Sequence, residues 1–411
     1  LKSGSGLINN QNASIGTGSI YVYGNGTGEI VNNASSIIMT GPESMGYYLT
    51  NSESLINNAD ITGLANGNMG IYSDKGSVVN SGNITLGDSE IIDENDSSKN
   101  RYAIGIYGED VEVNNSGNIK TGYRGTGIYT ENNKLTNSGN ITSDGEYAVG
   151  LWGSKAAIEN NGEIVMNGDY SQGVMGTSQS NIVNNSIITM NGNNSIGISG
   201  NEGTKIQNNG IINLYGNDST GIMLSNGSVL LNKGTINLGP GSNNAEVQNG
   251  NSVIPPSIVN AGVIKVDGKF ELNGINLTIQ VDPESIRKPE MSEITTDQYT
   301  TEDLKAKFLV SDAVRFQADS FDFSGPAMID PLFTQGTNAL VYKFENVFMA
   351  KDLASAESIT ADSNSVTFRA TPSMNENGNV DIWMEKIPYQ YFTNGMYYDK
   401  MAEILDKNYV L

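Results

Sequence analysis

Apolar and polar positions repeat along the first two thirds of the chain with a regular period. An asparagine in the pattern apolar-x-Asn returns mostly every 22 to 25 residues, with copies such as VVNSGNITL at 78–86 and LTNSGNIT at 135–142. A period of this length is typical of a solenoid. The repeated asparagines are Asn32, Asn57, Asn80, Asn115, Asn137, Asn160, Asn184, Asn208, Asn232 and Asn260, with a weaker copy at Asn9.

Short runs of β-branched residues within each copy alternate with Asn, Ser, Thr and Gly. Such runs predict short strands joined by tight turns, not helices. About 23 residues with three apolar clusters form one coil of three strands, and stacked coils form three parallel sheets around one narrow core. We therefore predict an all-β fold, a right-handed parallel β-helix with three-stranded coils of about 23–24 residues, over residues 1–267.

The repeated NSGNI segment has an architectural explanation. Stacking places equivalent residues of successive coils above one another, so asparagines at a bend can form a ladder of amide hydrogen bonds. We expect the glycines of the repeat to take the positive φ angles that the corners require. On this interpretation the asparagines themselves have no binding role.

The period is interrupted twice, the second time by a 28-residue spacing before Asn260, and is then lost. The spacing grows to 35 residues between Asn80 and Asn115, which predicts a projecting loop at 87–100. Residues 268–387 alternate like strands and carry larger aromatic residues, so we expect a β-rich cap that closes the solenoid. An Asn-Gly turn between SVTFRATP and NVDIWMEKI predicts a hairpin there. Helical spacing of apolar residues predicts one amphipathic helix in 388–411.

Charge and missing residue types narrow the function. The chain has 45 acidic and 23 basic residues, a net charge of −22, which argues against nucleic acid and favours cationic partners. It has no Cys and no His, which excludes disulfides, the usual zinc sites and histidine-dependent nucleophiles. Absence of Cys fits export as an unfolded chain, or chance in a proteome that uses little Cys. We expect no enzyme activity and no cofactor.

The 87–100 loop is a candidate metal site. It contains the acidic stretch DSEIIDEND, in which Asp88, Asp93 and Asp96 could hold Ca²⁺ through clustered carboxylates. The spacing matches no EF-hand. The alternative interpretation is an acidic loop without a metal.

A second ladder of glycines predicts an exposed aromatic row. The residue two places after each glycine is outward-facing if the intervening apolar residue faces the core. We identify Tyr72, Tyr107, Tyr129 and Trp152 as candidate binding residues for a protein or glycan partner. The alternatives are a row that shields its own sheet, or inward packing if the register differs by one. The complete row reads Tyr48, Tyr72, Tyr107, Tyr129, Trp152, Met175, Ser199 and Met223.

Cys-free coils, an irregular cap with an Asn-Gly hairpin and a terminal helix together resemble the passengers of classical type V autotransporters. The N-[NS]-G-x-I coils resemble those of the large RadD-like surface adhesins of oral anaerobes. The segment YYDKMAEILD is similar to the helix that leads from such passengers toward their membrane barrel. The resemblance covers essentially the whole chain. It implies an extracellular passenger, anchored in the outer membrane only through a C-terminal barrel that this sequence lacks.

The resemblance also implies a function. We expect a passenger fragment of a bacterial cell-surface adhesin that attaches cells through a receptor protein or glycan on other cells. Two alternatives stay open. One is a β-helix enzyme that degrades polysaccharides, and the other is a passive stalk that presents a binding tip located in other sequence.

Overall fold

The computed structural model describes residues 1–239, 241, 243–247, 255–272, 274–282, 308–332 and 339–407. The chain forms two compact units, Leu1–Pro256 and Ser257–Leu411. No helix among the described residues is long and apolar enough to cross a membrane.

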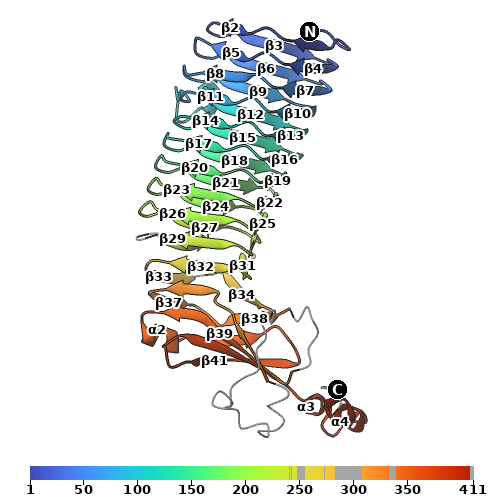
Figure 1. Ribbon diagram of the computed structural model, residues 1–411, viewed down its shortest axis with the longest axis vertical. Coiled ribbons are helices and arrows are strands. Elements are labelled where there is room, and N and C mark those ends of the chain that lie inside the picture. Colours follow the sequence, from blue (N-terminus) through green and yellow to red (C-terminus); the bar gives the residue numbers. More distant parts are fainter. Residues whose placement is uncertain are drawn as a thin grey trace. The chain divides into compact units, whose positions relative to one another are not determined.

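The first unit is a parallel β-solenoid of about 10 coils, as predicted (Figure 1). Each coil contributes one strand to each of three sheets, named A, B and C here, so that every third strand pairs in parallel with the one before. Sheet A consists of β1 (Leu7–Asn9), β4 (Glu29–Asn32), β7 (Ser54–Asn57), β10 (Gly76–Asn80), β13 (Val111–Asn115), β16 (Lys134–Asn137), β19 (Ala157–Asn160), β22 (Asn181–Asn184), β25 (Lys205–Asn208) and β28 (Val229–Asn232).

The other two sheets follow the same order. Sheet B consists of β2 (Ala13–Ile15), β5 (Ser36–Met39), β8 (Asp60–Gly63), β11 (Ile84–Leu86), β14 (Ile119–Thr121), β17 (Ile141–Ser143), β20 (Ile164–Met166), β23 (Ile187–Met190), β26 (Ile211–Leu214) and β29 (Thr235–Leu238). Sheet C consists of β3 (Ile20–Asn25), β6 (Met45–Thr50), β9 (Met69–Ser73), β12 (Ile104–Glu109), β15 (Thr126–Glu131), β18 (Val149–Ser154), β21 (Gln172–Thr177), β24 (Ile196–Gly200), β27 (Thr220–Leu224) and β30 (Asn243–Val247).

The core of this unit is a set of stacked apolar side chains, because strand alternation turns every second residue inward. In one coil, Leu135 on sheet A, Ile141 on sheet B and Leu151 on sheet C are all buried. The asparagine ladder beside this core also forms as predicted. The side chain of Asn115 donates from Nδ2 to Oδ1 of Asn137 at 2.8 Å, and the same contact recurs down sheet A.

The predicted role of the repeat glycines is wrong. Gly117 in the NSG corner does not have a positive φ, and neither does the ladder residue Gly105. These residues are glycine because neighbouring coils approach too closely for a side chain. A Cβ at Gly117 would lie 2.0 Å from the carbonyl oxygen of Gly82. Many of the positive φ angles belong to other residue types, including Asn132 and Lys155.

The segment predicted as a loop lies between β11 and β12. It contains a short 3-10 helix, η1 (Ser97–Lys99), and an isolated antiparallel bridge between Glu90 and Arg101. The ion pair between the side chains of these two bridge residues, at 2.8 Å, supports the base of the loop.

The second unit mixes parallel and antiparallel strands around aromatic side chains. Phe316 and Phe348 are buried and stack with ring centroids 5.3 Å apart. Its parallel strands form three groups. The first group is β31 (Ser257–Asn260), β34 (Asn276–Val281), β38 (Ala327–Pro331) and β40 (Ala361–Ser363), and the second is β32 (Val263–Val266), β36 (Phe316–Ala318), β39 (Val341–Ala350) and β35 (Phe308–Asp312). The third group is the pair β33 (Lys269–Leu272) and β37 (Ser320–Phe323).

The predicted hairpin and helix lie at the end of this unit. Strands β41 (Phe368–Met374) and β42 (Val380–Lys386) pair antiparallel, which confirms the hairpin. A short helix, α2 (Leu353–Glu357), precedes them. The single helix expected in 388–411 is instead two helices, α3 (Tyr389–Thr393) and α4 (Asp399–Lys407), because Gly395 takes a positive φ between them. Residues 408–411 lie outside the described part.

Candidate functional site

An aromatic row runs along the outer surface of sheet C. The strand register aligns Tyr72 with Tyr107, Tyr107 with Tyr129, and Tyr129 with Trp152. The residues just before them, such as Ile106, are fully buried in the core. The predicted outward register is therefore correct. We call the aromatic members of this row the aromatic strip. They are Tyr23, Tyr48, Tyr72, Tyr107, Tyr129 and Trp152.

Sequence reasoning missed the first member of the strip. Tyr23 aligns with Tyr48 and its ring stacks on that residue with centroids 5.8 Å apart. Tyr21 occupies the place where later coils have the ladder glycine, so the pattern used to find the row does not reach this coil. The alignment of Tyr23 with Tyr48 at the coil period was the signal that could have found it.

The rings of the strip contact one another. The centroid distance is 4.8 Å between Tyr48 and Tyr72 with nearly parallel rings at 11°, and 5.1 Å between Tyr72 and Tyr107. The tilt then grows, until Tyr129 and Trp152 meet edge to face at 81°. Since stacked rings cover each other's faces, the tyrosine part of the strip offers mainly ring edges and hydroxyl groups to a partner.

Carboxylates line one side of the strip. Glu109 and Glu131 follow Tyr107 and Tyr129 by two positions on the same strands, and the Tyr129 hydroxyl donates to Oε2 of Glu131 at 2.9 Å. Burial raises the pKa of Tyr72 to about 12, with smaller contributions from Tyr48 and nearby carboxylates. The hydroxyl groups of Tyr72, Tyr107 and Tyr129, whose pKa values are all raised by burial, are thus protonated donors at neutral pH, next to negative charge.

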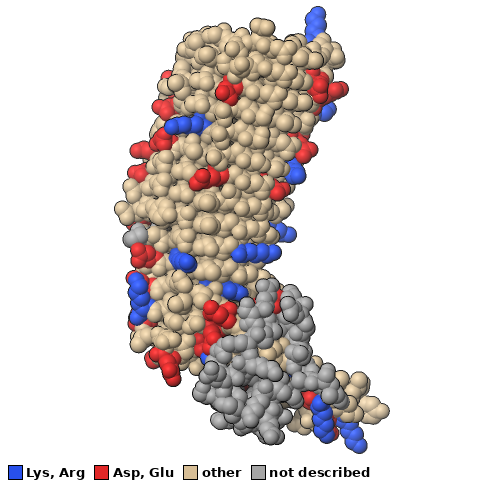
Figure 2. Space-filling view, in the orientation of Figure 1, with Lys and Arg blue, Asp and Glu red and all other residues tan. Residues whose placement is uncertain are grey.

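Charged residues are unevenly distributed on the first unit. Figure 2 shows them mainly along the two margins of the view, with few in the central band. An exposed surface of low charge between charged margins can make apolar contacts, while the acidic excess of the whole chain favours a cationic partner.

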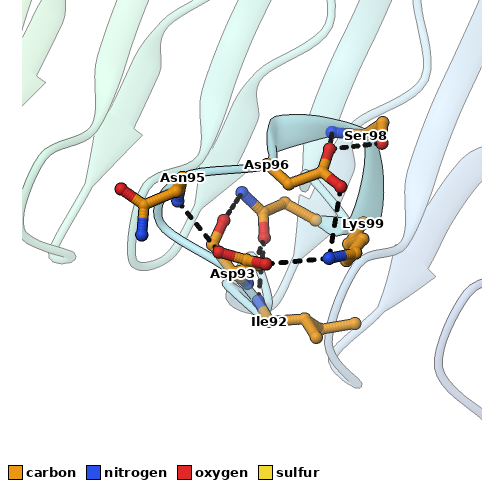
Figure 3. Close-up of polar contacts among 7 residues, drawn as sticks. Ile92, Asp93, Asn95, Asp96, Ser98 and Lys99 are labelled. Atoms are coloured by element: carbon orange, nitrogen blue, oxygen red, sulfur yellow. Dashed lines mark hydrogen bonds and ion pairs between the residues drawn. The ribbon is translucent and has the colours of Figure 1, made fainter.

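The acidic loop does not bring the three candidate metal ligands, Asp88, Asp93 and Asp96, together (Figure 3). Asp93 and Asp96 both face the ammonium group of Lys99, at 2.8 and 3.2 Å. Asp88 lies elsewhere and accepts the backbone N–H of Tyr123 at 2.8 Å. Among the described residues, no group of three or more Asp, Glu, His or Cys side chains could hold a metal ion. The ammonium group of Lys99 therefore lies between two of the three candidate ligands.

Hydrogen bonds keep these two carboxyl groups ionised. The bond from Lys99 is the main cause of the lowered pKa of Asp93, and the bond from Ser98 is the main cause of the lowered pKa of Asp96. The loop also reaches the neighbouring coil, because Glu94 pairs with Arg124 at 3.0 Å. These contacts hold the loop in a defined conformation.

A second aromatic stack was not predicted. Tyr147 and Tyr170 lie at equivalent corners of adjacent coils and stack with centroids 4.8 Å apart, and the guanidinium of Arg124 lies 5.1 Å from the Tyr147 ring. Both tyrosines have positive φ angles, which are unfavourable for bulky residues. Their spacing of one coil period in the sequence was a signal that could have revealed this pair.

Two family models match parts of the chain. The BigA third pectate lyase-like domain matches residues 2–153, and the BigA beta sandwich domain matches residues 303–388. No curated protein and no solved structure gives a match. The solenoid defines the class, a parallel β-helix with a β-rich second unit. The two matches make the chain similar to BigA-type bacterial surface adhesins, in agreement with its resemblance to autotransporter passengers. The words pectate lyase-like describe only a fold.

Proposed function

We propose that this chain is a non-enzymatic passenger part of an outer-membrane-anchored adhesin, which attaches the bacterium to other cells. The aromatic strip is the contact surface in this proposal. The observation that carries it is the continuous row of six partly exposed aromatic side chains on successive coils. Aromatic residues commonly supply most of the binding energy of an interface.

The strip suits a protein receptor better than a glycan. Contacts with sugar rings use the free faces of aromatic side chains, but the faces of Tyr48, Tyr72 and Tyr107 are covered by their neighbours. Ring edges and hydroxyl groups can pack into, and hydrogen-bond with, a protein surface. Glu109 and Glu131 favour basic residues on that surface.

The proposal is tested by coating beads with the purified chain and measuring their attachment to host and bacterial cells. Attachment should be saturable and should weaken as salt is added, because the chain carries 22 excess negative charges. Beads coated with serum albumin, another acidic protein, are the control. Attachment no greater than that of the control beads, on every cell type, would contradict the proposal.

A further inference from the structure

The outer surface of sheet B carries a groove that is separate from the aromatic strip. It extends over four coils, from β8 through β11 and β14 to β17, with a volume of about 510 Å³. Its floor consists of outward-facing residues in register, and one wall consists of residues at, or directly before, the start of each strand. The floor residues are Thr62, Thr85, Lys120 and Thr142, and the wall residues are Asp60, Asn83, Asn118 and Asn140.

Several hydrogen-bonding groups of the groove are free of protein partners within the described residues. The Oδ1 atom of Asn118 accepts the backbone N–H of Asn140 at 3.0 Å, and that of Asn140 accepts the N–H of Glu163 at 3.2 Å. Both amides are held by their oxygens, which leaves each Nδ2 as a free donor. The hydroxyl groups of Thr62, Thr85 and Thr142 are likewise left to donate and accept.

The polar lining is not required by the solenoid. At the wall position of later coils, Ile187 and Ile211 replace the amides and are 37% and 38% exposed. At the floor position of the coil after the groove, Val165 replaces threonine. Apolar residues can therefore occupy both positions. The floor is polar again at Thr189 and Asn213, but there the wall residues are Ile187 and Ile211, so the combination of wall amides and floor hydroxyls does not continue into these later coils.

The groove is close to neutral although the chain is strongly acidic. The ammonium of Lys120 pairs with Asp144 at 2.6 Å, so its charge is offset. Asp60 is the remaining charged lining residue, and one of its oxygens already accepts from Asn83 at 2.8 Å. A ligand with many hydroxyl groups and no net charge matches this set of donors and acceptors better than an ionic ligand.

We propose that this groove binds a neutral oligosaccharide, laid along the solenoid axis. Adjacent coils are about 4.8 Å apart, comparable to the length of one pyranose unit, so successive sugars can meet equivalent Thr and Asn side chains. This is a second binding site on a different sheet. It does not depend on the protein contact proposed for the aromatic strip.

The test begins with an array of neutral, sialylated and sulfated oligosaccharides probed with the full chain, and the best neutral ligand is then titrated by calorimetry. The Thr62→Val, Thr85→Val, Thr142→Val triple variant keeps the side-chain shape and loses three hydroxyls. It should bind at least about tenfold more weakly. Thr189→Val is the matched control, because Thr189 lies in the same outward row beyond the groove, and its affinity should equal that of the wild type.

A second variant tests the amide donors of the groove independently of the threonine hydroxyls. Asn118→Asp with Asn140→Asp keeps the oxygens that accept backbone N–H groups but removes the free Nδ2 donors, and it should also bind the neutral ligand more weakly. Alanine variants of the aromatic strip should bind the sugar normally, so failure of one site does not imply failure of the other. The proposal would be overturned if the chain bound only charged oligosaccharides on the array. It would also be overturned if the threonine triple variant bound the neutral ligand as tightly as wild type.

Discussion

The hydroxyl group of Tyr47 accepts a hydrogen bond from Nδ2 of Asn32 at 2.6 Å and donates one to Oδ1 of Asn57 at 2.9 Å. In later coils the ladder asparagines bond directly, as Asn57 does to Asn80 at 2.8 Å. Tyr47 aligns with Ile71 at a core position of sheet C and is fully buried. Its side chain therefore reaches through the interior from sheet C and joins the ladder on sheet A.

Replacing Tyr47 with phenylalanine should destabilise the solenoid by about 1–3 kcal/mol, because two buried amide groups lose a partner. Urea unfolding followed by circular dichroism measures the change. Tyr48→Phe is the control, since Tyr48 lies on the outer surface and its loss should shift stability by less than about 0.5 kcal/mol. Equal stability of Tyr47→Phe and wild type would mean that the ladder closes without the hydroxyl.

The substitution Ile164→Asp tests the single continuous core. Ile164 is fully buried on β20 between Ile141 and Ile188. A carboxylate there has no polar partner, so we expect a loss above about 4 kcal/mol and unfolding of neighbouring coils. The exposed neighbour Glu163→Ala is the control and should melt like wild type. A melting curve of Ile164→Asp that matched wild type would contradict the core assignment.

The main architecture could be predicted from sequence because each coil repeats the same constraint. An apolar residue two places before Asn137 and another four places after it must both face the core, and this pattern fixes the strand register in every coil. The outward direction of Tyr107 and Trp152 follows from the same alternation. Because every coil repeats the pattern, the local sequence is enough to predict the solenoid.

Contacts between coils were harder to predict. No side chain fits at Gly117, because a Cβ there would meet the carbonyl oxygen of Gly82 in the preceding coil. The φ angle of Gly117 could not be inferred from its residue type. Likewise, five acids in one loop suggested a metal site, but the position of Lys99 between Asp93 and Asp96 depends on how the loop folds. In both cases the group that determines the local structure belongs to another coil or to another part of the loop.

The strip tyrosines should make the protein sensitive to alkaline pH. The folded-state pKa of Tyr72 is raised from 10.0 to about 12, and burial also raises the pKa of Tyr107 and Tyr129. A raised folded-state pKa gives stability that is complete below pH 10 and is lost as pH rises through about 12. Absorbance of tyrosinate during a pH titration should show late ionisation in wild type and one fewer late group in Tyr72→Phe. Ionisation of all tyrosines near pH 10 in the folded protein would contradict this prediction.

Deletion of residues 388–411 should leave the first unit intact and weaken the second. Lys386, at the end of β42, is buried, and its ammonium contacts Asp406 on α4 at 3.3 Å. Loss of 388–411 removes both this ion pair and the contact of the ammonium with the Tyr389 ring, so the second unit loses stability. We expect β-type circular dichroism to persist while the second unit melts earlier. Asp406→Asn should reproduce much of the shift, and complete loss of β-structure on deletion would show that the solenoid itself depends on these helices.

The most direct measurement of the adhesin account compares cell attachment by wild type and by the Tyr107→Ala, Tyr129→Ala, Trp152→Ala triple variant. The control is Tyr147→Ala with Tyr170→Ala, which removes the other stacked aromatic pair, and circular dichroism establishes that all three proteins are folded. Aromatic anchors often contribute more than 1 kcal/mol each. The account therefore predicts at least about tenfold weaker attachment by the triple variant, graded among its single substitutions, and little change in the control. Equal attachment by folded wild type and folded triple variant would contradict the aromatic strip as the binding surface.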